Sequence, residues 1–258
     1  MLLWIWLGCS LAMTAVWAYA RHTQNIGYVD VAWAALMGLM AIAVAITGRG
    51  ALLPRALIGL LGAAWALRLC LHLFRRVHRQ PEDGRYVNLR DHWGGHQGKM
   101  FWFFQLQALV IALFVVPLLA AASNPVPGIS GWIIAGVLVW LLSVGGETLA
   151  DHQLSAWRDD PAHHGKTCRS GLWAWSRHPN YFFEALHWFS YALIAIGAPQ
   201  AWIALAGPAL MFAFVYRVTG IPYTEAQALR SRGEDYRAYQ REVSAFFPWP
   251  PRHPSPRH

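Results

Sequence analysis

Eight ionisable side chains lie inside or at the ends of long apolar stretches, where an uncompensated charge is costly. They are Asp30, Arg68, His72, Glu147, Asp151, Glu184, His187 and Arg217. Charged groups at bilayer depth are tolerated when they are paired or face a water-filled cavity, and they mark ligand sites and proton paths. Each of the eight is therefore a candidate for ligand binding or proton transfer.

The first polar stripe runs along one expected helix. Glu147 and Asp151 are four residues apart and Arg158 follows seven residues later, so a continuous helix would place all three on one face. This arrangement favours one wall of a polar cavity. The alternative is a helix end near the membrane interface, where the two carboxylates pair with Arg158.

The second stripe consists of Asn180, Glu184 and Trp188, which repeat the four-residue step. Just before it, Pro179 suits the first turn of a helix. Arg177 and His178 would then stand at the helix N-terminus, where charge and helix dipole together favour a phosphate or carboxylate. This segment therefore predicts an anion-binding site.

The N-terminal half offers a second group of candidates. Asp30 falls about one turn into an apolar stretch, and Arg75 and Arg76 follow another stretch. The segment 79–90 mixes Arg with turn residues, which is typical of an ordered loop that can hold an anion. The alternatives are a helix-end carboxylate for Asp30 and membrane anchoring for the two arginines.

The elements that position these residues follow from composition. Of the 258 residues, 56% are hydrophobic and only 13% are charged, whereas soluble domains carry about 25% charged residues. Seven apolar stretches approach the length of a membrane span: 2–20, 26–47, 51–74, 101–122, 131–149, 181–197 and 201–219. We therefore expect an all-α, integral membrane bundle of about seven transmembrane helices.

The basic residues predict the orientation of this bundle. Of 21 Lys and Arg residues, 18 fall in connections on one side of the predicted topology. The positive-inside rule then places the N-terminus in the periplasm and the C-terminus in the cytoplasm. The net charge of +8 is explained in this way, so we expect no nucleic acid partner. The excess of Arg over Lys favours a bacterial inner membrane, with multi-pass insertion.

Other site types find no support in the sequence. Gly165-Lys-Thr167 lacks the earlier glycine of a phosphate-binding loop, since Asp160 stands there. The three cysteines are too far apart for a metal motif, and we predict no metal. We expect one membrane domain over 1–248, with residues from about 140 to 248 binding the cofactor, and a disordered tail over 249–258.

Three motifs occur in order along the second half of the chain: 146–151 (Gly-Glu-Thr-Leu-Ala-Asp), 176–181 (Ser-Arg-His-Pro-Asn-Tyr) with Glu184, and Glu225 followed by Tyr236. In this pattern the chain resembles the steroid 5-alpha-reductase, sterol reductase and isoprenylcysteine carboxyl methyltransferase superfamily. Segments 27–30 and 82–86 add a resemblance to its bacterial 5-alpha-reductase-like branch.

This resemblance implies an NADPH-dependent oxidoreductase acting on CH–CH groups. The cofactor residues that it implies, with the neighbours expected beside them, are Arg75, Glu147, Asp151, Arg158, Arg177, His178, Asn180, Tyr181, Glu184, Trp188, Glu225 and Tyr236. The reductases usually carry Asn where Glu147 stands. No GxGxxG motif occurs, so the cofactor is expected among the helices and not in a Rossmann domain.

The resemblance also implies a carboxylate on an early helix and a tyrosine on a later one that polarise an enone carbonyl. Asp30 stands for the carboxylate, and at the second place this chain has His72 instead of Tyr. Either His72 or Tyr86 is expected to act with Asp30 as the proton donor. The alternative for His72 is a structural histidine. We expect reduction of a conjugated C=C bond in a lipophilic, steroid-like or other lipid substrate that enters from the bilayer among membrane lipids.

Two other functions stay open. An S-adenosylmethionine-dependent methyltransferase acting on a prenyl or phospholipid-type group is possible because those relatives share the Arg-His-Pro motif and the C-terminal Glu. The Asn180 and Glu184 pattern favours the reductases. A transporter or lipid-binding scaffold is the third class, although the inverted repeats of a transporter are not seen in the sequence.

Overall fold

A computed structural model describes residues 2–218 and 220–252, and within them the chain forms helices and loops without a strand. The prediction of an all-α fold is confirmed. The chain divides into two compact units, each described by itself. Unit 1 is Met1–Ile134 with Tyr191–Gly207, and unit 2 is Ala135–Ser190 with Pro208–His258. The division falls within three helices, α6, α7 and α8.

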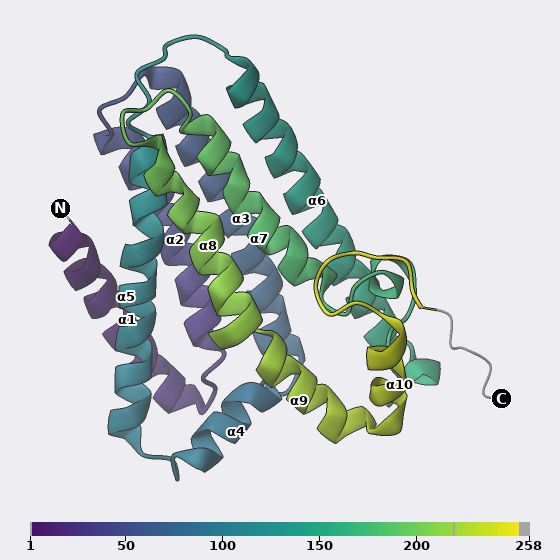
Figure 1. Ribbon diagram of the computed structural model, residues 1–258. Coiled ribbons are helices and arrows are strands. Elements are labelled where there is room, and N and C mark those ends of the chain that lie inside the picture. Colours follow the sequence, from purple (N-terminus) through teal and green to yellow (C-terminus); the bar gives the residue numbers. More distant parts are fainter. Residues whose placement is uncertain (1, 219, 253–258) are drawn as a thin grey trace. The chain divides into compact units, whose positions relative to one another are not determined.

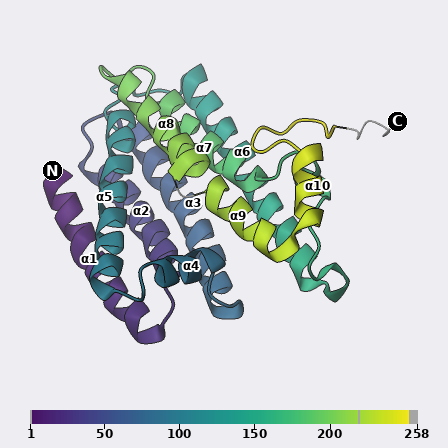
Figure 2. The same cartoon turned by 60° about the horizontal axis from the view of Figure 1, so that its bottom comes forward.

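The helices of unit 1 are α1 (Leu2–Thr23), α2 (Tyr28–Thr47), α3 (Leu52–Arg79), α4 (Gly84–His92), α5 (Gln97–Ala121) and the 3₁₀ helix η3 (Ala201–Leu205). In Figures 1 and 2, α2 runs along α3 and α1 runs along α5, and both pairs are in extensive contact. The short helix α4 lies across one end of this unit (Figure 2). Unit 1 is therefore a bundle of long helices closed at one end by a short one.

Small residues bring α2 and α3 close together. A Cβ atom on Gly62 would lie 2.5 Å from Ala41 Cβ, and one on Gly59 would lie 2.7 Å from Ala45 Cβ. Such stripes of Gly and Ala allow membrane helices to approach closely, so that dispersion forces hold them together. The closely packed α2–α3 pair holds Asp30, which lies in the first turn of α2.

A polar network joins α1 to α5. The Ser10 hydroxyl donates to Gln105 Oε1, Gln105 Nε2 donates to Thr14 Oγ1 at 3.1 Å, and Thr14 Oγ1 donates to the Ser10 carbonyl at 2.9 Å. Each of these polar groups has a hydrogen-bond partner, and these bonds offset the free energy that it costs to bury the Gln105 amide between two apolar helices. The network therefore fixes the register of α1 against α5.

Unit 2 contains most of α6 (Gly131–Asp159), α7 (Pro179–Ile194) and α8 (Ala206–Ala213), together with α9 (Ile221–Arg232) and α10 (Glu234–Glu242). Short helices η1 (Pro161–His163) and η2 (Gly171–Ala174) lie in the loop after α6, and a π-helical segment, η4 (Phe214–Val218), follows α8. α10 packs against α9, as Figures 1 and 2 show. Gly233, with φ +53°, allows the sharp turn between them.

Among the residues that the structure describes, six helical stretches are long and apolar enough to cross a membrane: Leu2–Thr23, Tyr28–Thr47, Leu52–Arg79, Gln97–Ala121, Gly131–Asp159 and Ala201–Arg232. The protein is thus a multi-pass membrane protein, as predicted. The expected span at 181–197 corresponds to α7, which has only 16 residues. A helix of that length reaches about 24 Å, less than the ~30 Å hydrocarbon core. The predicted sides of the membrane stay a prediction.

The end of α7 is fixed from a distant part of the sequence. Asn124, which is buried, donates from Nδ2 to the Ile194 carbonyl at 2.7 Å and to the Ile196 carbonyl at 3.1 Å. These bonds satisfy carbonyls left open at a helix C-terminus. Local hydropathy contains no sign of this cap, which explains why the apolar pattern placed the end of the helix at residue 197 and not at Ile194.

Candidate functional site

The predicted site residues fall into both units, and each group is described by itself. Asp30, His72, Arg75 and Tyr86 belong to unit 1, whereas the remaining predicted cofactor residues belong to unit 2. α6 is continuous over Glu147, Asp151 and Arg158, and α7 carries the stripe from Asn180 to Trp188. The predicted helix start at Pro179 is confirmed.

In unit 1, the structure brings Asp30 and Tyr86 into contact. Asp30 lies in the first turn of α2 and Tyr86 lies near the start of α4. Tyr86 Oη donates a hydrogen bond of 2.6 Å to Asp30 Oδ1. Burial of the ring and the nearby Asp30 carboxylate raise the pKa of Tyr86 well above its usual value. The phenol therefore keeps its proton at neutral pH.

Asp83 organises the charges beside this pair. Its carboxylate caps α4 by accepting from the Arg85 amide at 2.9 Å, and it accepts from Arg85 Nη2 at 2.9 Å and from Arg76. Burial opposes ionisation of Asp83, but Arg85 and Arg76 hold its pKa well below the usual range. Arg85 Nη2 lies 3.7 Å from Asp30 Oδ2, so one guanidinium serves both carboxylates.

Glu82 holds the turn between α1 and α2. Its Oε1 accepts from the Ile26 amide at 2.6 Å and from Arg90 Nη2 at 2.8 Å, and Arg90 also donates to the Gln24 carbonyl at 2.9 Å. The loop before α4 is thereby attached to the residues just before α2. This attachment places Asp30 opposite Tyr86.

The other two predicted residues of unit 1 lie on α3. His72 is half-buried, one helical turn before Arg76, and Arg75 is exposed. Tyr86, and not His72, is the residue that donates the hydrogen bond to Asp30 described above. The catalytic role predicted for His72 stays a prediction. The cofactor role of Arg75 also stays a prediction.

In unit 2, Glu225 on α9 is the acceptor shared by several predicted residues. Its Oε1 accepts from Arg177 Nε at 2.6 Å and lies 3.3 Å from His178 Nε2 and 3.4 Å from Tyr236 Oη. Its Oε2 accepts from Gln240 Nε2 at 2.8 Å. Four side chains from the start of α7 and from α10 thus converge on one carboxylate.

Arg177 also closes the end of α10. Its Nη1 donates to the Gln240 carbonyl at 3.1 Å and to the Val243 carbonyl at 2.6 Å, and its backbone amide donates to the Ser244 carbonyl at 2.8 Å. Carbonyls at a helix C-terminus lack partners within the helix, and a guanidinium there also complements the helix dipole. The donors expected to grip a phosphate are directed at protein acceptors in this structure.

Burial sets the protonation of the groups around Glu225. It lowers the pKa of His178 despite the nearby Glu225, so the imidazole is neutral at pH 7. Burial also raises the pKa of Tyr236, again with a contribution from Glu225. His178 stacks on Tyr181 with ring centroids 5.3 Å apart and an interplanar angle of 5°. The cluster is therefore a compact set of neutral donors and one ion pair.

A second polar group in unit 2 is more open. Asn180 Nδ2 donates to Asp151 Oδ1 at 3.2 Å, and the Tyr181 hydroxyl lies 3.1 Å from Thr224 Oγ1. These four side chains are half-buried, and Arg158 is exposed further along α6. Carboxylate, amide and hydroxyl groups of this kind suit ribose hydroxyls and amides, and an exposed guanidinium suits a phosphate.

The remaining predicted residues are buried. Glu147, Glu184 and Trp188 are 4%, 8% and 1% exposed, and His187 is fully buried. His187 Nδ1 lies 3.9 Å from Glu184 Oε1. Glu147, Glu184 and His187 are therefore interior groups and not surface ones. The cofactor roles of Glu147, Glu184 and Trp188 stay predictions.

Three residues close to these clusters were missed as sites by sequence reasoning. Asp83 directly precedes a helix start, which is the signal for an N-cap, and Arg85 follows in the same segment. Gln240 has no sequence signal, because its contact with Glu225 depends on how α10 folds back on α9. Asp83 and Arg85 position charges near Asp30, and Gln240 donates to the Glu225 carboxylate.

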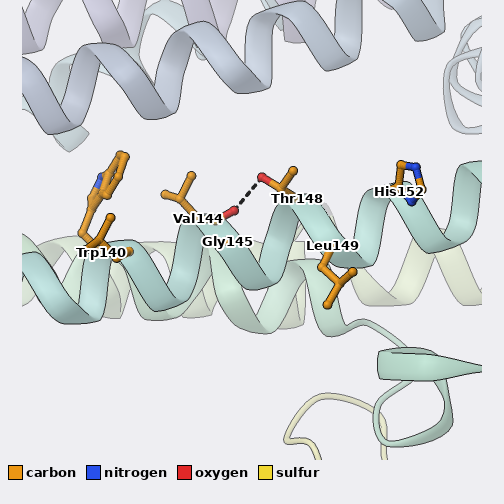
Figure 3. Close-up of a pocket in the computed structure, with 7 residues that line it drawn as sticks. Trp140, Val144, Gly145, Thr148, Leu149 and His152 are labelled. Carbon is orange, nitrogen blue, oxygen red and sulfur yellow. Dashed lines mark hydrogen bonds between the residues drawn. The ribbon is translucent and has the colours of Figure 1, made fainter.

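The apolar pocket drawn in Figure 3 has a volume of about 520 Å³ and lies along α6. It is lined by Trp140, Leu141, Val144, Gly145, Thr148, Leu149 and His152. Thr148 Oγ1 is directed back to the Val144 carbonyl, to which it donates at 2.6 Å. None of the predicted site residues lines this pocket, and a surface of this kind suits lipid chains.

The sequence is similar to known proteins over most of its length. An uncharacterized protein of Schizosaccharomyces pombe is 27% identical over 270 residues, which covers 90% of this chain and 75% of the relative. The profile of the DUF1295 family, described as a protein of unknown function, matches residues 16–243. This range contains both clusters described above, and the chain belongs to the DUF1295 family.

Proposed function

We propose that this protein is a membrane-embedded, NADPH-dependent reductase that saturates a conjugated carbon–carbon double bond in a lipophilic enone. The observation that carries the proposal is the 2.6 Å hydrogen bond from Tyr86 Oη to Asp30 Oδ1. A carboxylate on an early helix and a later proton donor are what the resemblance to the steroid 5-alpha-reductases requires. A lipophilic substrate would reach them from the bilayer.

The chemistry of the pair suits an enone carbonyl. The Tyr86 phenol keeps its proton because its pKa is raised well above the usual value. In the absence of substrate the proton is directed at Asp30, and a carbonyl oxygen beside Tyr86 would accept it. Bound NADPH would supply the hydride for the beta carbon, and a proton from water would complete the saturation at the alpha carbon. Tyr86 stabilises the negative charge that develops on the oxygen as the enolate forms.

Arg85 supports this role of Tyr86. Its Nη2 lies 3.7 Å from Asp30 Oδ2, and its guanidinium carbon lies 5.5 Å from the centroid of the Tyr86 ring. This positive charge attracts the Asp30 carboxylate and helps to hold it beside the phenol. Until substrate binds, Asp30 accepts from the phenol and so positions the Tyr86 hydroxyl. Tyr86 then turns its single proton to the carbonyl and is the group that touches it.

The side chains of unit 2 divide into two sets with respect to NADPH. Arg177, His178, Glu225 and Tyr236 satisfy one another, so we assign them a scaffolding role. The half-buried Asp151, Asn180 and Tyr181 and the exposed Arg158 have the chemistry to hold ribose hydroxyls, the amide and a phosphate. The donor set therefore fits the cofactor.

Thermal stability of the purified protein in detergent tests the cofactor. We expect NADPH to raise the melting temperature, because a ligand that binds only the folded state stabilises it. NADH and S-adenosylmethionine serve as comparisons. A shift with S-adenosylmethionine alone would identify a methyltransferase, and the absence of a shift with all three would favour a scaffold or transporter.

A matched pair of variants tests the chemistry. Tyr86→Phe removes only the phenol oxygen, so we expect an unchanged shift with NADPH and the loss of enone-dependent NADPH oxidation. Tyr19→Phe, at an exposed tyrosine of α1, is the control and should retain both. Normal oxidation by Tyr86→Phe would contradict the role of Tyr86.

A further inference from the structure

We infer that the segment after α10, residues 244–249, is an interfacial membrane anchor that lies among the lipid headgroups of the bilayer. The segment belongs to unit 2 and folds back onto aromatic residues of that unit. The inference is independent of the proposed reductase activity. It assigns a lipid-binding role to a stretch that the sequence predicted to lead into a disordered tail.

A continuous cluster of rings joins the segment to the membrane-spanning stretch. Phe246 lies 5.4 Å from Phe212 and 6.1 Å from Tyr216, measured between ring centroids. Phe247 lies 5.2 Å from Phe246 and 6.1 Å from Phe182. Phe212 and Tyr216 are exposed, whereas Phe246, which joins them to Phe247, is 4% exposed. The segment is therefore packed onto the membrane-spanning stretch through a buried ring.

Backbone hydrogen bonds hold the segment in this place. The Trp249 amide donates to the Trp175 carbonyl at 2.9 Å, and Ser176 Oγ donates to the Phe246 carbonyl at 2.8 Å. The side chains of Phe247 and Trp249 are then left 61% and 69% exposed, and Trp175 is 47% exposed. Two large aromatic side chains of the segment are thus exposed, and Trp175, from the turn after η2, is exposed beside them.

The polar surroundings identify the partner as the interface and not the hydrocarbon interior. Arg217 follows Tyr216 and Arg252 follows Trp249 by three residues, and both are exposed. The Arg217 guanidinium lies 6.0 Å from the Tyr216 ring centroid. Trp and Tyr concentrate at the headgroup level, because their rings are apolar at one end and polar at the other. Basic residues beside them attract anionic headgroups.

This anchor has a consequence for the Glu225 cluster. The Arg177 amide and guanidinium donate to the carbonyls of Ser244 and Val243, which immediately precede the aromatic rings. The anchor therefore fixes the depth of the scaffold around Glu225 relative to the headgroups. A lipid interface explains both the exposed rings and the exposed arginines near them.

A fluorescent label reports the environment of the segment. Trp249→Cys carries an environment-sensitive dye, in a background where the half-buried Cys70 is replaced by Ala, and the full chain is placed in nanodiscs with anionic lipid. We expect quenching by lipids with a nitroxide near the headgroup and little quenching by aqueous iodide. Arg237→Cys, at a 63% exposed side chain of α10, is the control and should be quenched by iodide.

Each other outcome overturns the inference. Iodide quenching at position 249 would show that the segment lies in water. Protection from both quenchers would show that protein, such as a second copy, covers it. If the variant does not fold, the wild-type chain is irradiated in nanodiscs that contain headgroup-diazirine lipids. Adducts at Phe247 or Trp249 support the anchor, and their absence, with adducts found elsewhere in the chain, contradicts it.

Discussion

Arg177 Nε donates to Glu225 Oε1 at 2.6 Å, and this ion pair joins the start of α7 to α9. Both side chains are largely buried, with 11% and 16% of their surface exposed. The same guanidinium donates to the Val243 carbonyl at the end of α10. One arginine therefore holds three helices of unit 2 together.

We predict that Arg177→Lys destabilises the protein in the absence of any cofactor. Lysine keeps the charge but cannot direct donors to Glu225 and to the α10 carbonyls at once. Loss of one partner of a buried pair costs about 3 to 5 kcal/mol, and the lysine charge recovers part of it. The melting temperature of the ligand-free protein in detergent measures the effect. An unchanged melting temperature with weakened NADPH binding would instead make Arg177 a phosphate ligand.

The close packing of α2 and α3 gives a second prediction. Gly62→Ala places a Cβ 2.5 Å from Ala41 Cβ, so we expect a loss of about 1 to 3 kcal/mol from overpacking. Gly8→Ala, on α1, is the matched control, because a Cβ there meets nothing within 4 Å. Unfolding in mixed detergents compares the two variants. Equal stabilities would show that α2 and α3 do not approach each other this closely.

The charge network at Asp83 predicts a dependence on pH. The pKa of Asp83 lies well below its usual value in the folded state, and the unfolded value is about 4. Its stabilising contribution is therefore complete above about pH 4 and is lost as the pH falls through the folded-state value. Asn is also a good N-cap, so Asp83→Asn removes the ion pairs and keeps the cap.

We expect Asp83→Asn to cost about 2 kcal/mol at pH 7, with the difference from wild type shrinking below about pH 4. Asp91→Asn, at an exposed position of the same helix, should change little at either pH. Melting temperatures between pH 7 and pH 3 provide the measurement. A difference that is constant over this range would mean that the ion pairs of Asp83 are not its source.

The sequence predicted the helices well, because a membrane span is defined by length and apolarity, which are local properties. It also predicted the start of α7 through Pro179. The end of α7 depends on Asn124, which lies far away in the chain, so hydropathy alone placed it too late. Helix boundaries of this kind are set by tertiary hydrogen bonds.

The polar contacts could be predicted only in part. Arg177 has the chemistry of a phosphate ligand, but a guanidinium binds a carboxylate with the same geometry. Residue type alone therefore does not distinguish a phosphate from Glu225. The pairing of Asp30 with Tyr86 depends on the folding of the segment 82–86, which is fixed by Glu82 and Asp83. These contacts join distant segments and leave no periodic pattern in the sequence.

A variant at the contact between Asp151 and Asn180 distinguishes a role in cofactor binding from a role in folding stability. Both side chains are half-buried, and Asn180 Nδ2 lies 3.2 Å from Asp151 Oδ1. In Asn180→Ala, water can therefore replace the lost hydrogen bond to Asp151. We predict that it weakens NADPH binding about tenfold, the equivalent of about 1.4 kcal/mol, with a nearly unchanged melting temperature. Asn88→Ala, at an exposed amide of α4, is the control. Titration with NADPH measures the affinity, and wild-type affinity in Asn180→Ala would exclude this pair from the cofactor site.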